Sequence, residues 1–291
     1  MVSSTRPIGR NGRAVGCHVS VAGGLPRAVD QALRRGCDAL QIFPSNPRGW
    51  AVPDPDLGAE AELAARVSEL GFPLFLHAPY LINLSAPDRA VHEHSVHNLG
   101  FALERGARLA ADGVVVHTGS ARGNAREVAV RRAAGAILGL LDRVDGIDLV
   151  IELTAGSGFM IAGTVAEAND LLEACEHHPR VRICLDTCHL YAAGVDFTTR
   201  TGLRRLRAEL RELDPERVSV IHVNDSRDPL GSRRDRHARV GSGTIGLEPF
   251  RAFLHTTGLR HVPLVLETPG TIDEQIHDVA LVRRLSAPAR P

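Results

Sequence analysis

Lysine is missing from this sequence. All 34 of its Lys+Arg residues are arginine, and 34 acidic residues balance them to a formal net charge of zero. Schiff-base aldolases, pyridoxal-phosphate enzymes, Walker-type P-loop NTPases and hydrolases with a carbamylated lysine are excluded, because each needs a lysine amine. The zero net charge also means that no overall field attracts the chain to nucleic acid or to an anionic membrane.

Cysteine and long apolar runs are scarce as well. The five cysteines are an odd number and form no Cys-x-x-Cys pair, which is typical of a reduced protein inside the cell. No apolar run reaches the roughly 18 residues of a membrane span, and no signal-peptide pattern opens the chain. We therefore expect a cytoplasmic protein without a membrane segment, in which the polar residues 1–13 form a flexible N-terminal arm.

Short apolar runs recur along the rest of the chain. They are almost continuous in apolar residues rather than alternating, as in strands that are buried on both faces of a parallel sheet. The predicted strands are Val15–Val19, Ala39–Phe43, Pro73–His77, Val114–His117, Leu149–Glu152, Ile183–Asp186, Val218–Val223 and Val262–Glu267.

Helical patterns separate these strands, with apolar residues three and four positions apart. The predicted helices are Leu25–Arg35, Leu57–Leu70, Arg89–Ala110, Ala125–Val144, Val165–Cys175, Leu203–Leu213, Leu247–His255 and Asp273–Leu285, with caps such as Thr164 and Thr271. Eight strand–helix units of about 35 residues indicate an α/β protein with a (β/α)8 TIM-barrel fold. We predict a single domain over residues 14–287, with a long loop after the seventh strand, from about residue 225 to 246.

Six consecutive predicted strands end in a potential metal ligand. These strand-end residues are His77, His117, Glu152, Asp186, His222 and Glu267. Active sites of TIM barrels lie at this end of the strands, so the six side chains should converge on one pocket. Imidazole and carboxylate ligands together suit Zn²⁺ or Mn²⁺, and a shared carboxylate suits two ions about 3.5–4 Å apart.

Two loops add further ligand candidates. His189 follows Asp186 by three residues, and Asp235 and His237 lie in the long loop. Alternate residues of an extended segment face the same side, so His189, Asp235 and His237 could hold a third metal. His18, at the end of the first strand, is a candidate for a hydrogen bond to a ligand.

These residues lie in motifs that resemble those of endonuclease IV, the family of zinc-dependent apurinic/apyrimidinic (AP) endonucleases of base-excision repair. The resemblance extends from about Val15 to Leu285. Its motifs are Gly16–Gly24 (GCHVSVAGG), His77–Leu84 (HAPYLINL), His117–Ser120 (HTGS), Ile151–Gly156 (IELTAG), Leu185–His189 (LDTCH), Ala192–Gly194 (AAG), His222–Asp225 (HVND), Gly231–His237 (GSRRDRH), Gly241–Gly243 (GSG) and Leu266–Thr268 (LET).

The resemblance implies three zinc ions and nine ligand positions, all of which are filled in this chain. The first ion would be held by His77, His117 and Glu152, the second by Glu152, Asp186, His222 and Glu267, and the third by His189, Asp235 and His237. We expect Glu152 and Glu267 to be the catalytic residues. Glu152 would bridge two ions, and Glu267 would orient the attacking water or take its proton.

The resemblance also implies a substrate, which is double-stranded DNA that contains an abasic site. Arg48 matches an arginine inserted into the duplex, and Tyr80 and Leu81 match residues that fill the gap left by the flipped-out nucleotide. The arginines of the long loop would contact phosphates, namely Arg233, Arg234, Arg236 and Arg239. Departures from the family pattern are Thr118 in place of proline, Leu153 in place of asparagine and Arg227 in place of lysine.

The expected reaction is hydrolysis of the phosphodiester bond 5′ to the abasic site, which leaves a 3′-hydroxyl and a 5′-deoxyribose phosphate, together with removal of 3′ blocking groups. An abasic nucleotide neither stacks nor pairs, so flipping it out costs little. We expect no nucleotide cofactor, a monomer that works without a partner subunit, and association with the nucleoid when the enzyme acts on DNA. The missing lysine also excludes Schiff-base lyase chemistry at the abasic site.

Two rival functions share parts of this pattern. Sugar isomerases and epimerases of the xylose-isomerase-like barrels bind one Mn²⁺ or Mg²⁺ through residues that resemble Glu152, Asp186, His222 and Glu267. They lack both the histidine pair at the third and fourth strands and the Asp-x-His loop. A non-catalytic barrel that binds damaged DNA would show eroded ligands, and none is eroded here.

Overall fold

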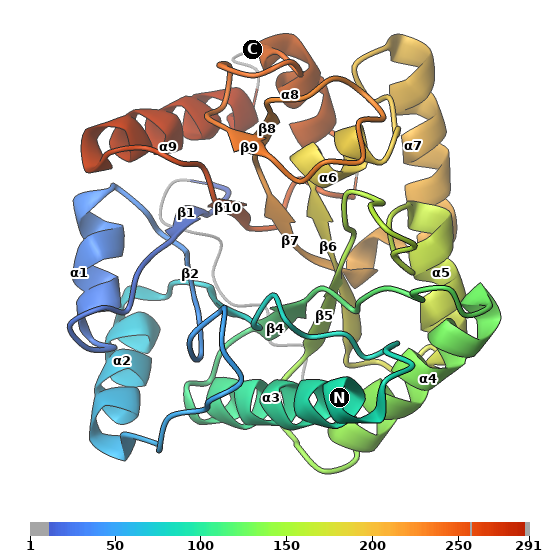
Figure 1. The fold of residues 1–291 in the computed structure, drawn as a ribbon. Coiled ribbons are helices and arrows are strands. Elements are labelled where there is room, and N and C mark those ends of the chain that lie inside the picture. The colour runs from blue at the N-terminus through green and yellow to red at the C-terminus, as the bar shows by residue number, and fades with distance from the viewer. Residues whose placement is uncertain (1–11, 257, 289–291) are drawn as a thin grey trace.

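Eight parallel strands close into a barrel in the computed structural model, which describes residues 12–256 and 258–288 (Figure 1). Neighbouring strands follow the order β1-β10-β7-β6-β5-β4-β3-β2 around the barrel. The strands are β1 (Val15–His18), β2 (Leu40–Ile42), β3 (Leu74–His77), β4 (Gly113–Val116), β5 (Leu149–Glu152), β6 (Val181–Asp186), β7 (Val218–His222) and β10 (Leu264–Leu266). The predicted TIM barrel is confirmed, and all eight predicted strands coincide with barrel strands.

Helices surround the barrel on its outer side (Figure 1). They are α1 (Arg27–Arg34), α2 (Leu57–Leu70), α3 (Arg89–Arg108), α4 (Arg126–Leu141), α5 (Val165–Ala174), α6 (Thr187–Ala192), α7 (Arg200–Leu213), α8 (Leu247–Leu254) and α9 (Ile272–Ser286), with a 3₁₀ turn η1 (Pro215–Arg217) before β7. The predicted caps Thr164 and Thr271 each form a capping box with a glutamate three residues later, which fixes where α5 and α9 begin.

The inside of the barrel is a layered core. Six apolar side chains from six strands form a cluster of their own, namely Phe75, Val115, Val150, Cys184, Val220 and Val265. Side chains alternate along a strand, so the residue two positions further on also faces the interior. On all six strands that residue is one of the predicted strand-end ligands, which therefore form the next layer toward the carboxyl end of the barrel.

The structure adds short elements that the sequence pattern does not predict. The helix α6 follows β6 directly, and β8 (Asp225–Ser226) pairs antiparallel with β9 (His237–Ala238) inside the long loop after β7. These pieces are too short to have a periodicity of their own. The loop is therefore a folded segment, not an irregular one.

The predicted N-terminal arm is described only in part, because residues 1–11 lie outside the described residues. Arg13, which we expected in this flexible arm, is instead tied to the barrel. Its Nη1 donates to the carbonyl oxygen of Leu254 at 3.0 Å, and its Nε donates to that of Val262. Arg13 thus belongs to the folded part of the chain.

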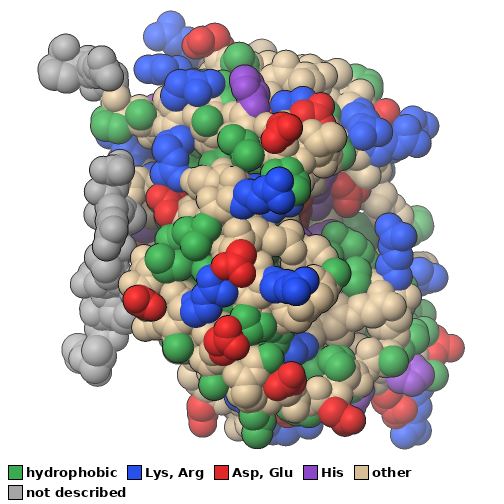
Figure 2. All heavy atoms as spheres, turned by 90° about the vertical axis from the view of Figure 1, so that its left-hand side faces the viewer, with side chains coloured by type: hydrophobic (Ala, Val, Ile, Leu, Met, Phe, Trp, Pro, Cys, Tyr) green, Lys and Arg blue, Asp and Glu red, His purple; other side chains and the backbone are tan. Residues whose placement is uncertain are grey.

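Charged side chains of both signs are interspersed on the side of the molecule that faces the viewer in Figure 2, which is the left-hand side of Figure 1. No large area of a single sign covers this face. Among the described residues, no helix is both long and apolar enough to cross a membrane.

Candidate metal centre

Eight of the nine predicted ligands lie in three overlapping groups at the carboxyl end of the barrel. Within each group the donor atoms lie within 4.8 Å of one another. The groups are His77, His117 and Glu152; Glu152, Asp186, His222 and Glu267; and Asp186, His189 and His237. The first two match the predicted sets, and the third contains Asp186 in addition to two of its three predicted members.

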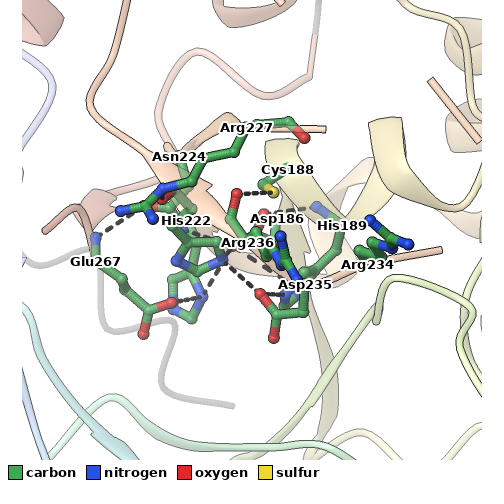
Figure 3. A network of polar contacts seen from close by, with 12 residues as sticks. Asp186, Cys188, His189, His222, Asn224, Arg227, Arg234, Asp235, Arg236 and Glu267 are labelled. Atoms are coloured by element: carbon green, nitrogen blue, oxygen red, sulfur yellow. Dashed lines mark hydrogen bonds and ion pairs between the residues drawn. The ribbon is translucent and has the colours of Figure 1, made fainter. Parts of the chain in front are cut away.

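The ninth predicted ligand, Asp235, completes the third group. Its Oδ1 lies 3.1 Å from His189 Nε2 and 3.2 Å from His237 Nε2. Figure 3 shows Glu267 beside His222 on one side of the site and Asp235 near His189 on the other. The structure thus brings all nine predicted ligands together.

Glu152 lies at the centre of the cluster and is fully buried. Its Oε2 is 3.0 Å from the Nε2 atoms of both His77 and His117. Its Oε1 is 3.2 Å from His222 Nδ1 and 3.0 Å from His189 Nδ1. The two oxygens of one carboxylate therefore face two different sets of imidazoles, which is the arrangement that a bridging ligand requires.

Hydrogen bonds to backbone carbonyls select the tautomers of two histidines. His77 Nδ1 is 2.8 Å from the carbonyl oxygen of Ala78, and His189 Nδ1 is 3.1 Å from that of Leu153. A carbonyl only accepts, so each Nδ1 carries a proton and donates it, and each Nε2 is the atom that remains for a metal ion. These contacts orient the rings in the way that protein partners orient metal-binding histidines.

Gln41, the middle residue of β2, is a further functional residue that is not among those predicted. It is fully buried, and its Nε2 lies 2.7 Å from Glu267 Oε1 and 3.1 Å from His18 Nδ1. The Glu267 carboxylate only accepts, so the amide nitrogen faces it and Oε1 faces His222 Nε2 at 2.9 Å. His222 Nε2 then donates to Gln41, and its Nδ1 points at the three carboxylates of the second group.

The alternation of side chains along the strands could have predicted that Gln41 faces the barrel interior. Gln41 and His18 are paired across β1 and β2, and Gln41 is also paired with Phe75, which faces the interior. His18 Nδ1 is 3.6 Å from Glu267 Oε1, in line with its expected contact to a ligand. All eight strands therefore carry a polar residue at or next to their carboxyl end.

Asn224, just beyond β7, is a second residue missing from the predicted set. Its Nδ2 donates to Asp186 Oδ2 at 2.6 Å, and its Oδ1 accepts the backbone N–H of Glu267 at 2.9 Å. Figure 3 shows Asn224 between the strands that carry these carboxylates. This one side chain fixes the spacing of β6, β7 and β10 at the ligand layer.

The long loop after β7 is folded around a buried carboxylate. Asp225 is fully buried and accepts the backbone N–H groups of Gly241, Gly243 and Ile245 at 2.9–3.0 Å. A Cβ atom at Gly243 would lie 2.4 Å from Asp225 Oδ1, so only glycine fits there. This cradle, with the β8–β9 pair, holds His237 over the barrel end.

The electrostatics of the cluster favour cations. Burial would raise the pKa of Glu152, but the positive charges of His117 and His222 outweigh it and hold that pKa well below its usual range. Burial would lower the pKa of His237, but the carboxylates of Asp186 and Asp235 outweigh it and raise this pKa to about 9. Protons thus occupy positions to which the carboxylates would also draw metal ions.

The donor set fits divalent metal ions. His189 Nε2 and His237 Nε2 are buried, and among the described residues neither makes a hydrogen bond of normal geometry, although both lie within 3.2 Å of Asp235 Oδ1. Buried polar atoms rarely lack a partner, and a lone pair that faces a carboxylate is explained by a shared cation. Imidazole nitrogens with carboxylate oxygens are the ligands that zinc takes in hydrolytic sites.

A pocket of about 480 Å³ opens over the ligands. It is lined by His77, Tyr80, His117, His189, Arg227, Asp235, Arg236, His237, Glu267 and Pro269. Tyr80 is half exposed, and its ring centroid lies 5.4 Å from those of His77 and Phe43. Of the residues predicted to contact DNA, Tyr80 and Arg236 therefore lie in the pocket wall.

The other residues predicted to contact DNA lie outside this pocket lining. Arg48, Arg233 and Arg234 are exposed, and Leu81 is 38% exposed beside Tyr80. The backbone N–H of Tyr80 donates to Pro47 at 3.1 Å, so the loops that carry Arg48 and Leu81 are joined to each other.

The expected phosphate contact of Arg239 is wrong. Its guanidinium is engaged by α9, with Nη2 2.9 Å from Asp278 Oδ1 and Nη1 2.8 Å from Glu274 Oε1. The Asp278 carboxylate is 1% exposed and would be left without this partner if Arg239 turned toward DNA. Arg239 therefore anchors the long loop to the barrel.

Comparison with known proteins gives one consistent result. A sequence model of the xylose isomerase-like TIM-barrel family matches residues 29–285. A probable endonuclease 4 of Streptomyces avermitilis is 41% identical over 278 residues, which cover 93% of this chain and 89% of that protein. A probable endonuclease 4 of Methanoculleus marisnigri is 40% identical over 279 residues, which cover 94% and 98% of the two chains.

Solved structures agree with these relatives. The crystal structure of endonuclease IV from Thermus thermophilus matches with a TM-score of 0.79 and 35% identity, over 94% of this chain and 98% of that one. A D-psicose 3-epimerase of Clostridium cellulolyticum matches over 94% and 95% of the chains, with a TM-score of 0.64 and 16% identity. At that identity the epimerase shares the fold alone, so the comparisons favour the nuclease over the sugar isomerase.

Proposed function

The chain belongs to the endonuclease IV family of xylose isomerase-like TIM barrels, and we propose that it cuts duplex DNA at the phosphodiester bond 5′ to abasic sites. As a member of this family it is a metal-dependent AP endonuclease, a hydrolase of DNA repair. The proposed products are a 3′-hydroxyl and a 5′-deoxyribose phosphate. Removal of 3′ blocking groups is proposed as a second activity, because it needs the same hydrolysis at a strand end.

One observation carries this proposal. Three donor groups overlap through two shared carboxylates, Glu152 and Asp186, below a single pocket whose wall contains arginine. Several neighbouring cations suit a phosphodiester substrate, because they offset its negative charge during hydrolysis. A sugar isomerase needs only the four-residue group and gives no reason for the histidine pair or for the Asp235–His237 segment.

We propose that the resident metal is zinc, with three ions per chain. The first would be held by His77, His117 and Glu152, the second by Glu152, Asp186, His222 and Glu267, and the third by His189, Asp235 and His237, with Asp186 close to the third. When bound, zinc offsets the negative charge of a phosphate and acidifies water at neutral pH.

Glu267 is the proposed proton acceptor in the pocket. Burial would raise its pKa, but the charge of His222 and the hydrogen bond to His18 hold the pKa well below its usual range, so the carboxylate is ionised and can accept. Gln41 donates to Oε1 of this carboxylate and fixes its orientation, and Oε2 lies 3.4 Å from His222 Nδ1. Glu267 would orient the attacking water and accept its proton, and Glu152 would hold the two metal positions together.

Recognition of the lesion is assigned to the rim of the pocket. Arg48, Tyr80 and Leu81 would occupy the duplex from which the abasic nucleotide is flipped. The loop arginines Arg233, Arg234 and Arg236, and the pocket residue Arg227, would contact phosphates. The pocket would exclude an intact nucleotide by its size.

A single chain supplies every ligand of the metal centre, so we propose that a monomer suffices and that residues 14–287 form one catalytic domain. No step of the hydrolysis uses a nucleotide cofactor. The proposed place of action is the cytoplasm, at the nucleoid, because the substrate is chromosomal DNA.

The decisive experiment combines metal analysis with incision. The purified enzyme should contain about three zinc ions per chain and should nick a duplex that carries one abasic site, on its 5′ side, until EDTA removes the metal. His237→Ala should lose one ion and most of the activity, whereas His261→Ala, which changes an exposed histidine away from the pocket, should keep both. A wild-type enzyme that contains metal but leaves the abasic duplex intact would contradict the proposal.

A further inference from the structure

An exposed aromatic side chain, Phe159, lies in the loop that follows β5. Phe159 is 75% exposed, more than any other large hydrophobic residue that the structure describes as exposed. Its φ is +66°, in the left-handed region that side chains rarely adopt. Both its exposure to water and its backbone conformation are unfavourable in the free protein, so its place calls for an explanation.

Neighbouring loops hold Phe159 in this conformation. Its carbonyl oxygen accepts the N–H of Ala121 at 3.0 Å, and the N–H of Ile161 donates to Gly119 at 3.2 Å. Ser120 and Met160 form an isolated antiparallel bridge between these contacts. These contacts join the loops after β4 and β5 to each other, and they fix the backbone on both sides of Phe159 while its side chain stays exposed.

A free positive charge belongs to the same frame. Arg122 is exposed, follows the bridge residue Ser120 by two positions, and also has a positive φ, of +44°. Over residues 12–256 and 258–288, its guanidinium has neither a carboxylate within ion-pair distance nor a hydrogen-bond acceptor. Phe159 and Arg122 together, called the 122/159 ledge below, present an aromatic ring and an unpaired cation.

The position of the ledge relates it to the pocket. Its two loops begin directly after His117 and Glu152, so they leave the barrel at the metal centre. In the barrel order, β4 and β5 lie between β3, whose loop carries Tyr80 and Leu81, and β7, whose loop carries Arg233, Arg234 and Arg236. The 122/159 ledge therefore lies on the rim of the barrel between the loop after β3 and the loop after β7, which both carry proposed DNA contacts.

We propose that the 122/159 ledge is a further DNA contact, which binds the substrate duplex beside the abasic site. Arg122 would pair with a backbone phosphate, and the ring of Phe159 would lie against a base or deoxyribose that is uncovered where the duplex bends. Aromatic rings bind bases without sequence preference, and apolar wedges at opened base steps are common in proteins that bend DNA. This inference rests on the proposed function, because it concerns the same substrate.

The test measures DNA binding and incision separately. Binding of the zinc-loaded enzyme would be followed by fluorescence anisotropy with a labelled abasic duplex whose scissile linkage is a non-hydrolysable methylphosphonate. Phe159→Ala should weaken binding about fivefold or more, the lower end of a base–aromatic contact. Arg122→Ala should lower the slope of log Kd against log salt by about one. In both variants KM for the cleavable duplex should rise while kcat stays near the wild-type value.

Matched variants test whether the effect belongs to the ledge. Leu57→Ala changes a 64%-exposed side chain on α2, and Arg204→Ala changes an exposed arginine on α7, so both should bind DNA like the wild type. Phe159→Gly suits the left-handed conformation and should bind DNA as weakly as Phe159→Ala without a lower Tm. A lower Tm with unchanged DNA affinity would show a packing role and would overturn the inference.

The outcomes also separate this inference from the proposed function. A wild-type enzyme that incises abasic DNA, with Phe159→Ala and Arg122→Ala binding equally well, would refute only the ledge. A wild-type enzyme that neither incises nor binds abasic DNA would refute both proposals. If sedimentation shows a wild-type dimer that Phe159→Ala dissociates at unchanged DNA affinity, the ledge is a contact between copies and the DNA inference is wrong.

Discussion

Replacing Gln41 by leucine should weaken the metal centre without emptying the core. Leucine fills a similar volume but cannot bond the Glu267 carboxylate at 2.7 Å or accept from His222 Nε2 at 2.9 Å. Hydrogen bonds to charged groups contribute about 1.5–3 kcal/mol each. Loss of a partner that orients a ligand typically costs about 10–100-fold in metal affinity, or roughly 1.4–2.7 kcal/mol. The second range overlaps the value of the one bond to the charged Glu267 carboxylate, so we expect a metal affinity that is weaker by about 10–100-fold.

Competition with a chromogenic zinc chelator would measure this affinity directly. The loss should fall on the ion shared by Glu152, Asp186, His222 and Glu267, and kcat should fall with it while KM changes little. Gln31→Leu, which removes a glutamine on the outer helix α1, is the control and should keep both values. Gln41→Leu with wild-type zinc affinity and wild-type kcat would refute the role given to these hydrogen bonds.

Other consequences concern the third metal group, protons and loop anchoring. His237→Ala should remove one ion per chain by elemental analysis, and full metal content would contradict its assignment. The pKa of His237 is raised to about 9, so this imidazole is protonated below that pH and must release its proton to bind a metal ion. The metal affinity of the third group should therefore increase as the pH rises toward 9. Metal binding that calorimetry finds to be independent of pH would refute this. Arg239→Ala should destabilise the protein by about 1–2 kcal/mol in urea titrations, because the buried Asp278 loses its partner. Arg234→Ala should leave stability unchanged but lower the slope of log Kd for DNA against log salt by about one. The reverse result would make Arg234 the loop anchor and Arg239 the phosphate contact.

The sequence was sufficient to predict the barrel and the convergence of its ligands. Each of the six ligand-bearing strands ends in a ligand two positions after an apolar interior residue, as in Val150 and Glu152 or Val220 and His222. Since the fold fixes which end of the strands meets, alternation alone places these side chains in one layer. Distances in sequence of about 35 residues therefore did not hide the site.

The missed features depend on contacts that no local pattern records. Gln41 is not a metal ligand, so a search for ligands passes over it although it shares the interior layer. Arg239 lies in an arginine-rich loop, and its true partners come from α9, 35 and 39 residues later. The cradle at Asp225 arises only when the loop returns to β8, so its order could not be read from composition.

The charge balance of the chain takes on a different meaning once the ligands are placed. Four of its acidic residues, Glu152, Asp186, Asp235 and Glu267, face one another at the barrel end, and a formal charge of zero includes all of them. Three divalent ions would bring the holoenzyme to about +6, and this charge would be concentrated at one pocket rather than spread over the surface. A chain without net charge can therefore attract DNA strongly at the one place where the strand is to be cut, and removal of the metal should weaken DNA binding as well as abolish incision.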